Sequence, residues 1–365
     1  MQVRIVFALL LSLALNGAYG QHVALKAKNG VLSAQYELGK QYYTGLGEIQ
    51  NHAQALVWFE KAAKRNHIQA CWMAGTMYEN GEGTTPDLRK AFGYYSDAAD
   101  RDFLPAQKKV AIMFEEGRGT AQSYQHAFVR YRILAGKNDV LGMEKLGDYY
   151  AQGIAVGKDP QEAAYWYEKA MKQGSEEAAV SLAMLYTTGD GLAPDYTAAQ
   201  KLLQQPVKEG NARALFIMGR LVEEGKVESE TTPFYMYSKA ALAGYKPAKS
   251  RLGYCYFHGK GVAANAKEAF DWFSASENIV ESDEQYALAM LYLEGKVTPV
   301  NYDKAIYLLQ QSAGNFYPEA QYQLGCLYEE GKGVKKDLKE AYNWYQMAAN
   351  GGYQPAAKKI NTLQK

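Results

Sequence analysis

The stretch AQYQLGCLYEEGKGV, residues 320–334, decides the fold because a version of it recurs along the chain. Its first residue aligns with eight earlier positions, and neighbouring positions are 36 residues apart at every step except one, which is 34. The nine copies start at Ala34, Ala70, Ala106, Gly142, Ala178, Ala214, Ala248, Glu284 and Ala320. A fixed period of this length is typical of a solenoid built from supersecondary units.

The first part of each copy has the pattern of a helix that ends at a glycine. With the first residue counted as position 0, position 4 is leucine in six copies and position 5 is Gly or Ala in all nine. Position 8 is aromatic in eight copies, so the apolar positions share one helical face. The small residue at position 5 predicts close approach by a neighbouring helix. Position 11 is glycine in every copy, which predicts a left-handed residue just after the helix.

A second helix is predicted to follow in each copy. Position 17 is Asn, Asp or Ser in eight copies, and these side chains accept hydrogen bonds from the free N–H groups at a helix start. Alanine at position 21 and bulky pairs at positions 24 and 25, such as Trp344-Tyr345, continue an apolar stripe. The sixth copy has a shorter loop, and there we expect Thr232 to cap a shorter helix that begins at Pro233.

The predicted fold is an all-α solenoid of nine helix-loop-helix repeats, because neither helix of a copy can bury its apolar stripe alone. Residues 21–33 are expected to cap the N-terminal end, and residues 356–365 to form a C-terminal capping helix or tail. The repeats are expected at residues 34–69, 70–105, 106–141, 142–177, 178–213, 214–247, 248–283, 284–319 and 320–355.

Residues 1–20, MQVRIVFALLLSLALNGAYG, have the pattern of a secretory signal peptide. Arg4 precedes an apolar run, and Ala18 and Gly20 form a small-residue cleavage site. The apolar run is too short to cross a hydrocarbon core of ~30 Å, which takes about 20 residues. None of the asparagines begins an Asn-x-Ser/Thr sequon, which favours a bacterial source. We therefore expect an exported protein, periplasmic or secreted, without a membrane segment after signal cleavage.

The repeats resemble the Sel1-like repeat family, a relative of the tetratricopeptide repeat, and exported bacterial members most of all. The ninth copy matches the family pattern from Ala320 through Leu324-Gly325, Tyr328 and Gly331 to Trp344-Tyr345. The resemblance implies a right-handed superhelical solenoid and a non-enzymatic adaptor or scaffold in bacterial envelope regulation or host-cell interaction. The alternative that it implies is a cell-wall or β-lactam hydrolase. Such members carry a regular cysteine pair in each repeat, which this chain lacks.

Composition and motifs argue against several other classes of protein. Forty basic residues balance thirty-nine acidic ones without a long run of either sign, so no nucleic-acid-binding surface is indicated. The five histidines are scattered and form no metal-binding motif, and no serine-nucleophile motif occurs. We predict no catalytic, metal-binding or cofactor-binding residues, and no cofactor. The expected partner is a protein or extended peptide.

The three cysteines, Cys71, Cys255 and Cys326, are expected to be buried free thiols. An intervening helix should separate Cys255 from Cys326 by more than a disulfide can span. A disulfide-linked dimer is the alternative interpretation, and the oligomeric state is left open.

Candidate partner-binding residues lie on the first helices, which line the concave groove of tetratricopeptide-like superhelices. Aromatic and cationic side chains are common anchors of protein interfaces. The aromatic residues at position 2 have a second interpretation, since they could instead pack within their own repeat. The candidates are Tyr36, Trp72, Lys109, Lys145, Phe216, Arg220, Arg251, Tyr254, Tyr286 and Tyr322.

Overall fold

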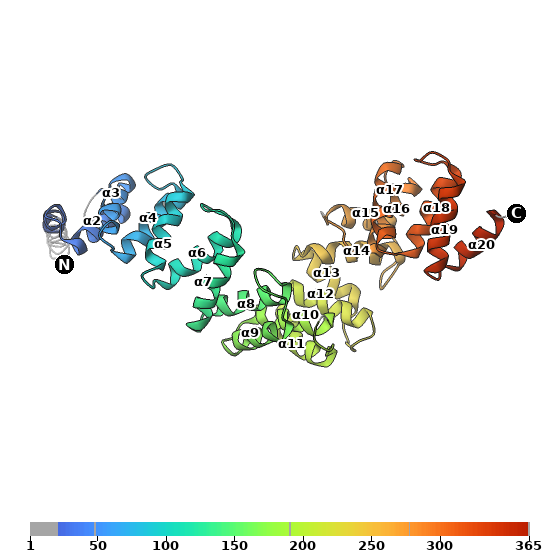
Figure 1. Ribbon diagram of the computed structural model, residues 1–365, viewed down its shortest axis with the longest axis horizontal. Helices are drawn as coiled ribbons and strands as arrows, with labels where there is room; N and C mark the ends of the chain where they lie inside the picture. Colours follow the sequence, from blue (N-terminus) through green and yellow to red (C-terminus); the bar gives the residue numbers. More distant parts are fainter. Residues whose placement is uncertain (1–20, 47–48, 190, 277, 364–365) are drawn as a thin grey trace, which may run out of the picture. The chain divides into compact units, whose positions relative to one another are not determined.

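The computed structural model describes residues 21–46, 49–189, 191–276 and 278–363. The predicted signal peptide, residues 1–20, lies outside the described residues. Within the described ranges every regular element is a helix, as the sequence predicted (Figure 1). None of the helices in this part of the chain is long and apolar enough to cross a membrane.

The helices alternate between first and second helices of successive copies. The first helices are α2 (Leu32–Thr44), α4 (Ile68–Asn80), α6 (Leu104–Glu116), α8 (Val140–Gln152), α10 (Glu176–Thr188), α12 (Ala212–Glu223), α14 (Lys246–His258), α16 (Ser282–Glu294) and α18 (Pro318–Glu330). The second helices are α3 (His52–Ala63), α5 (Leu88–Ala99), α7 (Tyr124–Gly136), α9 (Pro160–Lys172), α11 (Tyr196–Glu209), α13 (Pro233–Leu242), α15 (Ala266–Ser274), α17 (Tyr302–Gly314) and α19 (Leu338–Asn350). Residues 21–28 are also helical, and α20 (Gln354–Leu363) ends the series.

The predicted helix boundaries are confirmed by their backbone and caps. All nine glycines at position 11 have φ between 65° and 76°, the left-handed region, and in the ninth copy the Gly331 N–H donates to the Leu327 carbonyl. Asp159 and Asp337 accept from the N–H groups of the first turns of α9 and α19. In the sixth copy the Thr232 side chain caps the ten-residue helix α13, which begins at Pro233 as predicted.

The small residue at position 5 allows the two helices of a copy to approach closely. The aromatic ring at position 25 lies directly against it, so that an added Cβ on Gly147 would lie 2.4 Å from the Tyr167 ring. Gly325 and Tyr345 repeat this contact, with 2.6 Å from an added Cβ to the ring. Tyr345 and Tyr167 are almost fully buried as a result. In the fifth and eighth copies position 25 is instead Leu203 and Leu309, which are also fully buried, so an aromatic or a leucine side chain forms the centre of a repeat.

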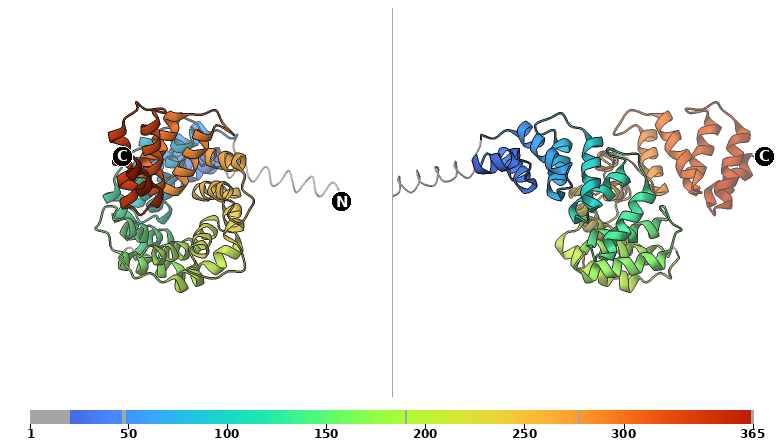
Figure 2. Two further views of the ribbon diagram at one scale, coloured as in Figure 1. Left: turned by 90° about the vertical axis from the view of Figure 1, so that its right-hand side faces the viewer. Right: turned by 60° about the vertical axis from the view of Figure 1, so that its left-hand side comes forward.

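The chain divides near residues 185–193 into two compact units. In each unit consecutive helices lie side by side in the order of the sequence (Figure 2). In the first unit Val23 and Ala27 pack against Leu38. In the second unit Ala356 of α20 packs against Tyr345 of α19.

All three cysteines are free thiols. Cys71 and Cys255 are buried, as expected, and burial raises the pKa of the Cys255 thiol to about 12. Cys326 differs from the expectation because it is only partly buried. Its Sγ lies 3.5 Å from the Tyr345 hydroxyl, at the edge of the contact between α18 and α19.

The glycine contact predicts opposite effects for one substitution at two helical positions. Gly147→Ala should lower the free energy of unfolding by about 1–3 kcal/mol, because the new methyl group overlaps the Tyr167 ring. Gly93→Ala should raise it by about 0.5–1 kcal/mol, since Gly93 faces open space within α5 and alanine favours a helix. Urea unfolding of both variants provides the measurement, and effects of the same sign would contradict this description of the repeat centre.

Candidate functional site

The aromatic candidates at position 2 pack within their own repeats. Each half-buried ring lies against other aromatic side chains, at position 25, just before the next first helix, or both. The centroid of the Tyr36 ring lies 5.7 Å from that of Phe59 and 4.5 Å from that of His67, and the Trp72 ring lies 5.0 Å from Tyr95 and 5.7 Å from Phe103. The Phe216 ring lies 5.8 Å from Tyr237 and 5.4 Å from Tyr245, and the Tyr286 ring lies 5.5 Å from Tyr317. The Tyr322 ring lies 5.4 Å from Tyr345 and 5.2 Å from Tyr353. The structure therefore gives these residues a packing role, and partner binding by them stays a prediction.

The cationic candidates Lys109 and Lys145 lie in ion pairs between successive first helices. Glu115, at position 9 of α6, accepts from the Tyr131 hydroxyl of its own copy at 2.6 Å and lies 3.1 Å from Lys145 Nζ of the next copy. The same arrangement recurs at Glu79 with Tyr95 and Lys109, at Glu223 with Tyr237 and Arg251, and at Glu329 with Tyr345 and Lys359. The charge of these cations is thus already matched inside the chain.

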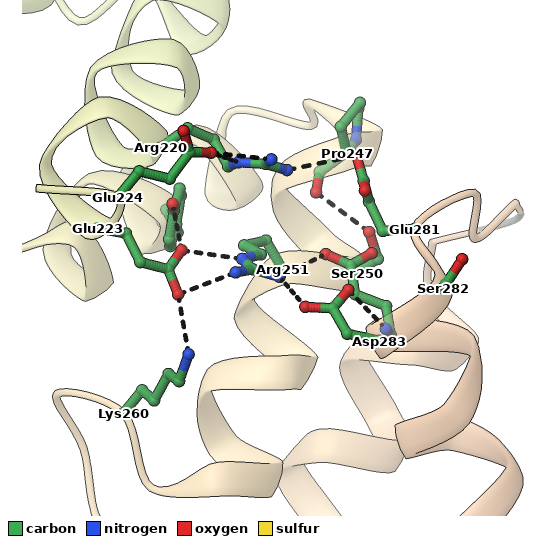
Figure 3. A network of polar contacts seen from close by, with 12 residues as sticks. Arg220, Glu223, Glu224, Pro247, Ser250, Arg251, Lys260, Glu281, Ser282 and Asp283 are labelled. Atoms are coloured by element: carbon green, nitrogen blue, oxygen red, sulfur yellow. Dashed lines mark hydrogen bonds and ion pairs between the residues drawn. The ribbon is translucent and has the colours of Figure 1, made fainter. Parts of the chain in front are cut away.

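Arg251 of α14 is the most buried of the cationic candidates, with 8% of its surface exposed. Its Nε and Nη2 donate to the two carboxylate oxygens of Glu223 on α12, at 3.0 Å and 2.9 Å. Its Nη1 donates to Asp283 on α16 at 2.8 Å. Figure 3 shows the guanidinium held between these two carboxylates. One side chain therefore joins three successive first helices.

Arg220 forms a second bridge across the same helices. Its guanidinium lies 3.0 Å from Glu224 on the last turn of the α12 region and 3.3 Å from Glu281, the residue before α16 (Figure 3). Lys260, in the loop after α14, lies 3.3 Å from Glu223. The side chains of Glu281, Lys260 and Glu224 are 54%, 48% and 44% exposed, so they form the solvent side of the network.

Tyr254 is buried, and its ring lies against two cations of this network. The Arg251 guanidinium lies 4.3 Å and Lys260 Nζ 4.8 Å from its ring centroid. The centroid of the His258 ring also lies 4.4 Å from that of Tyr254. Burial raises the pKa of the Tyr254 hydroxyl. With 8% of its surface exposed, Tyr254 supports the cations and offers little area to a partner.

Glu284 is a buried carboxylic acid that sequence reasoning did not select. It is 2% exposed and lies 3.7 Å from Arg251 Nη1. Burial raises the pKa of Glu284 to about 7, although Ser250 and Arg251 act in the opposite direction. A signal was present in the sequence, because the equivalent position holds Ala or Gly in the other eight copies.

We call these nine residues the α12–α16 cluster. They are Arg220, Glu223, Glu224, Arg251, Tyr254, Lys260, Glu281, Asp283 and Glu284. The structure brings together three of the sequence candidates here, with six residues that were not among the candidates. Among the described residues, no group of three or more His, Cys, Asp or Glu side chains has the arrangement of a metal site.

The three copies that build this cluster depart most from the repeat pattern. The sixth copy has a short loop and the ten-residue α13, and the seventh has α15, which is nine residues long. The eighth copy has Glu284 at the small-residue position. Departures from a regular pattern concentrate at functional or strained sites. The cluster is therefore the strongest candidate for a functional site in the part of the chain that the structure describes.

Comparison with known proteins identifies the repeat. The family model described as Sel1 repeat matches nine segments, residues 32–67, 68–103, 104–129, 140–175, 176–210, 212–245, 246–276, 285–315 and 318–353. A search of curated protein sequences gives no significant match.

Several solved structures are similar to this chain. A protective antigen present in uropathogenic Escherichia coli strains, displaying an SLR fold, is 25% identical over 94% of this chain and 90% of the other, with a TM-score of 0.42. A Sel1 repeat protein from Oxalobacter formigenes is 21% identical over the same shares, with a TM-score of 0.47. The immunity protein Pa5087 from Pseudomonas aeruginosa is 22% identical over 53% of this chain and 75% of the other, with a TM-score of 0.33.

Truncation of Arg251 should destabilise the second unit strongly. Arg251→Ala leaves Glu223, Asp283 and Glu284 without their shared cation, and removal of one partner from a buried ion pair costs about 3–5 kcal/mol. Lys145→Ala, at the same repeat position but in a more exposed pair, should cost less than about 1 kcal/mol. Urea unfolding combined with amide hydrogen exchange in α14 and α16 measures both effects. Equal, small losses would show that the Arg251 network is not structural.

Glu284 should make the stability of the protein fall as the pH rises from about 4.5 to about 7. Over this range the unfolded chain loses the Glu284 proton while the folded chain keeps it, so unfolding becomes easier. The effect is on the order of 3 kcal/mol, and Glu284→Gln should remove it. The measurement is the difference in unfolding free energy between this variant and the natural protein at pH 5 and at pH 8. The exposed Glu330→Gln is the control, and a wild-type pH profile in Glu284→Gln would refute the assignment.

Proposed function

The chain belongs to the Sel1-repeat family, and from this premise we propose that it is a non-enzymatic adaptor or scaffold that binds a protein or extended peptide on its first helices. Sel1-repeat proteins are in general protein-interaction scaffolds. The site of contact that we propose is the α12–α16 cluster. Export by the predicted signal peptide would place this activity in the bacterial envelope or at a host cell.

The observation that carries the proposal is the position of the cluster in the three irregular copies. Elsewhere each glutamate at position 9 is joined to the next copy by lysine, as Glu79 and Glu115 are. At Glu223 this lysine is replaced by Arg251, whose planar guanidinium can serve two carboxylates at once. Fixed side chains lose less conformational entropy when a partner binds, so a network of this kind is preorganised for recognition.

The structure also changes which of the candidates should meet the partner. Arg251 and Tyr254 are buried and act through the side chains that they hold in place. Glu224, Lys260 and Glu281 are exposed, and Arg220 is partly exposed. These four residues are the proposed contact surface.

A pair of double variants tests this function. Arg220→Ser with Glu281→Ser removes an exposed ion pair of the cluster, whereas Lys267→Ser with Asp271→Ser removes an exposed ion pair from α15, a second helix. In affinity capture from the organism's own extract, the first variant should recover the partner about ten-fold less than the natural protein, which corresponds to ~1.4 kcal/mol. The second variant should recover it normally. Identical recovery by both would remove the cluster from the proposed contact surface.

A further inference from the structure

The α12–α16 cluster carries an excess of negative charge, although the whole chain has a net charge of only +1. Arg220, Arg251 and Lys260 supply its three cations. They face five carboxylates, those of Glu223, Glu224, Glu281, Asp283 and Glu284. The excess is two negative charges when all five are ionised, and one when Glu284 keeps its proton.

The two arginines of the cluster have little capacity left for a partner, whereas Lys260 is 48% exposed. Glu223 accepts from Tyr237, Arg251 and Lys260. Arg251 is buried between Glu223 and Asp283. Arg220 divides its guanidinium between two carboxylates. An acidic partner would therefore have to displace existing ion pairs.

The exposed carboxylates, in contrast, can still accept hydrogen bonds and ion pairs from a partner. Glu281 is 54% exposed and lies 3.3 Å from Arg220, its one ion-pair partner among the described residues. Glu224 is 44% exposed and shares the same guanidinium. A carboxylate offers about four acceptor positions, so each can receive further donors from outside.

A pair of tyrosine rings, Tyr286 and Tyr317, lies in the same unit, and Tyr317 is close to Asp283 of the cluster. The rings of Tyr286 and Tyr317 are 5.5 Å apart and partly buried. Burial raises the pKa of the Tyr317 hydroxyl, and the nearby carboxylates of Glu319 and Asp283 add to the effect. Within the cluster two cations already lie over the Tyr254 ring. Carboxylates beside aromatic faces favour ammonium and guanidinium groups.

We propose that the α12–α16 cluster binds an extended segment of a partner protein that is rich in lysine or arginine, with Glu224 and Glu281 as its main ion-pair acceptors and with Tyr286 and Tyr317, on the side of Asp283, as an aromatic surface. This inference rests on the proposed function, and it specifies the chemistry of the partner. It favours a cationic partner over an acidic one, because the arginines of the cluster are already paired with its carboxylates.

Synthetic peptides test the inference on the full chain. The probes are three fluorescently labelled ten-residue peptides in which Ser alternates with Arg, with Glu or with Gly, and binding is followed by fluorescence anisotropy. The arginine peptide should bind most tightly, and its affinity should fall several-fold between about 50 mM and about 200 mM salt, because exposed charges are screened.

A charge-reversed variant and a matched control locate the binding. Glu224→Lys with Glu281→Lys should weaken the arginine peptide by about ten-fold or more. Glu330→Lys is the control, because Glu330 occupies the same repeat position as Glu224, is 51% exposed and also pairs with a cation, Lys332. It should bind the peptide as the natural protein does. Circular dichroism of both variants checks that these surface substitutions leave the helices intact.

The possible outcomes separate this inference from the proposed function. Loss of arginine-peptide binding in the cluster variant alone supports the inference. Absence of binding, equal binding by the cluster variant and the control, or preference for the glutamate peptide overturns it. If the arginine peptide fails while Arg220→Ser with Glu281→Ser still reduces partner capture, the adaptor function stands and only the cationic partner is wrong.

Discussion

In four of the nine copies, a glutamate at position 9 of the first helix links one repeat to the helix pair that follows it; these residues are Glu79, Glu115, Glu223 and Glu329. It accepts a hydrogen bond from the hydroxyl of a buried tyrosine in its own copy and pairs with a cation from the next copy, as at Glu115, or from α20 in the case of Glu329. Apolar burial between copies is large but not directional. The glutamate supplies direction, because its hydrogen bonds and ion pair link the centre of one repeat to a fixed position on the next. Burial would raise the pKa of Glu223, but Arg251 and the Tyr237 hydroxyl lower it below the ordinary value.

This contact also decides what the first helices can offer to a partner. A cation that completes the inter-repeat link is not available at the surface, and an aromatic ring at position 2 that packs on the repeat centre is only half accessible. In the α12–α16 cluster the groups that remain exposed are Glu224, Glu281 and Lys260, near the ends of first helices. Recognition by this surface then depends on the few copies in which the contact is altered.

Most of the fold could be predicted from the sequence, whereas most of the candidate site could not. The nine glycines at position 11 and the caps at position 17 are local signals that need no tertiary information, and Thr232 with Pro233 identified the irregular helix correctly. The pairing of Lys145 with Glu115 joins residues 30 apart, and no local pattern reveals it. Glu284 could have been selected from the sequence alone, because a carboxylate at a position that is Ala or Gly in the other eight copies indicates an unusual environment.

The buried acid Glu284 and its charged neighbours occur where the sixth to eighth copies depart from the regular repeat. Helix α15 is only nine residues long, and after it Glu281 and Asp283 pair with Arg220 and Arg251. A regular helix with alanine in place of Glu284 would avoid the cost of burying an acid whose pKa is about 7. A natural protein that keeps such a cost usually gains specificity or function from it. The gain that fits these contacts is a rigid acidic surface, held by a buried arginine, on a solenoid in which the equivalent glutamates Glu79, Glu115 and Glu329 link successive helix pairs.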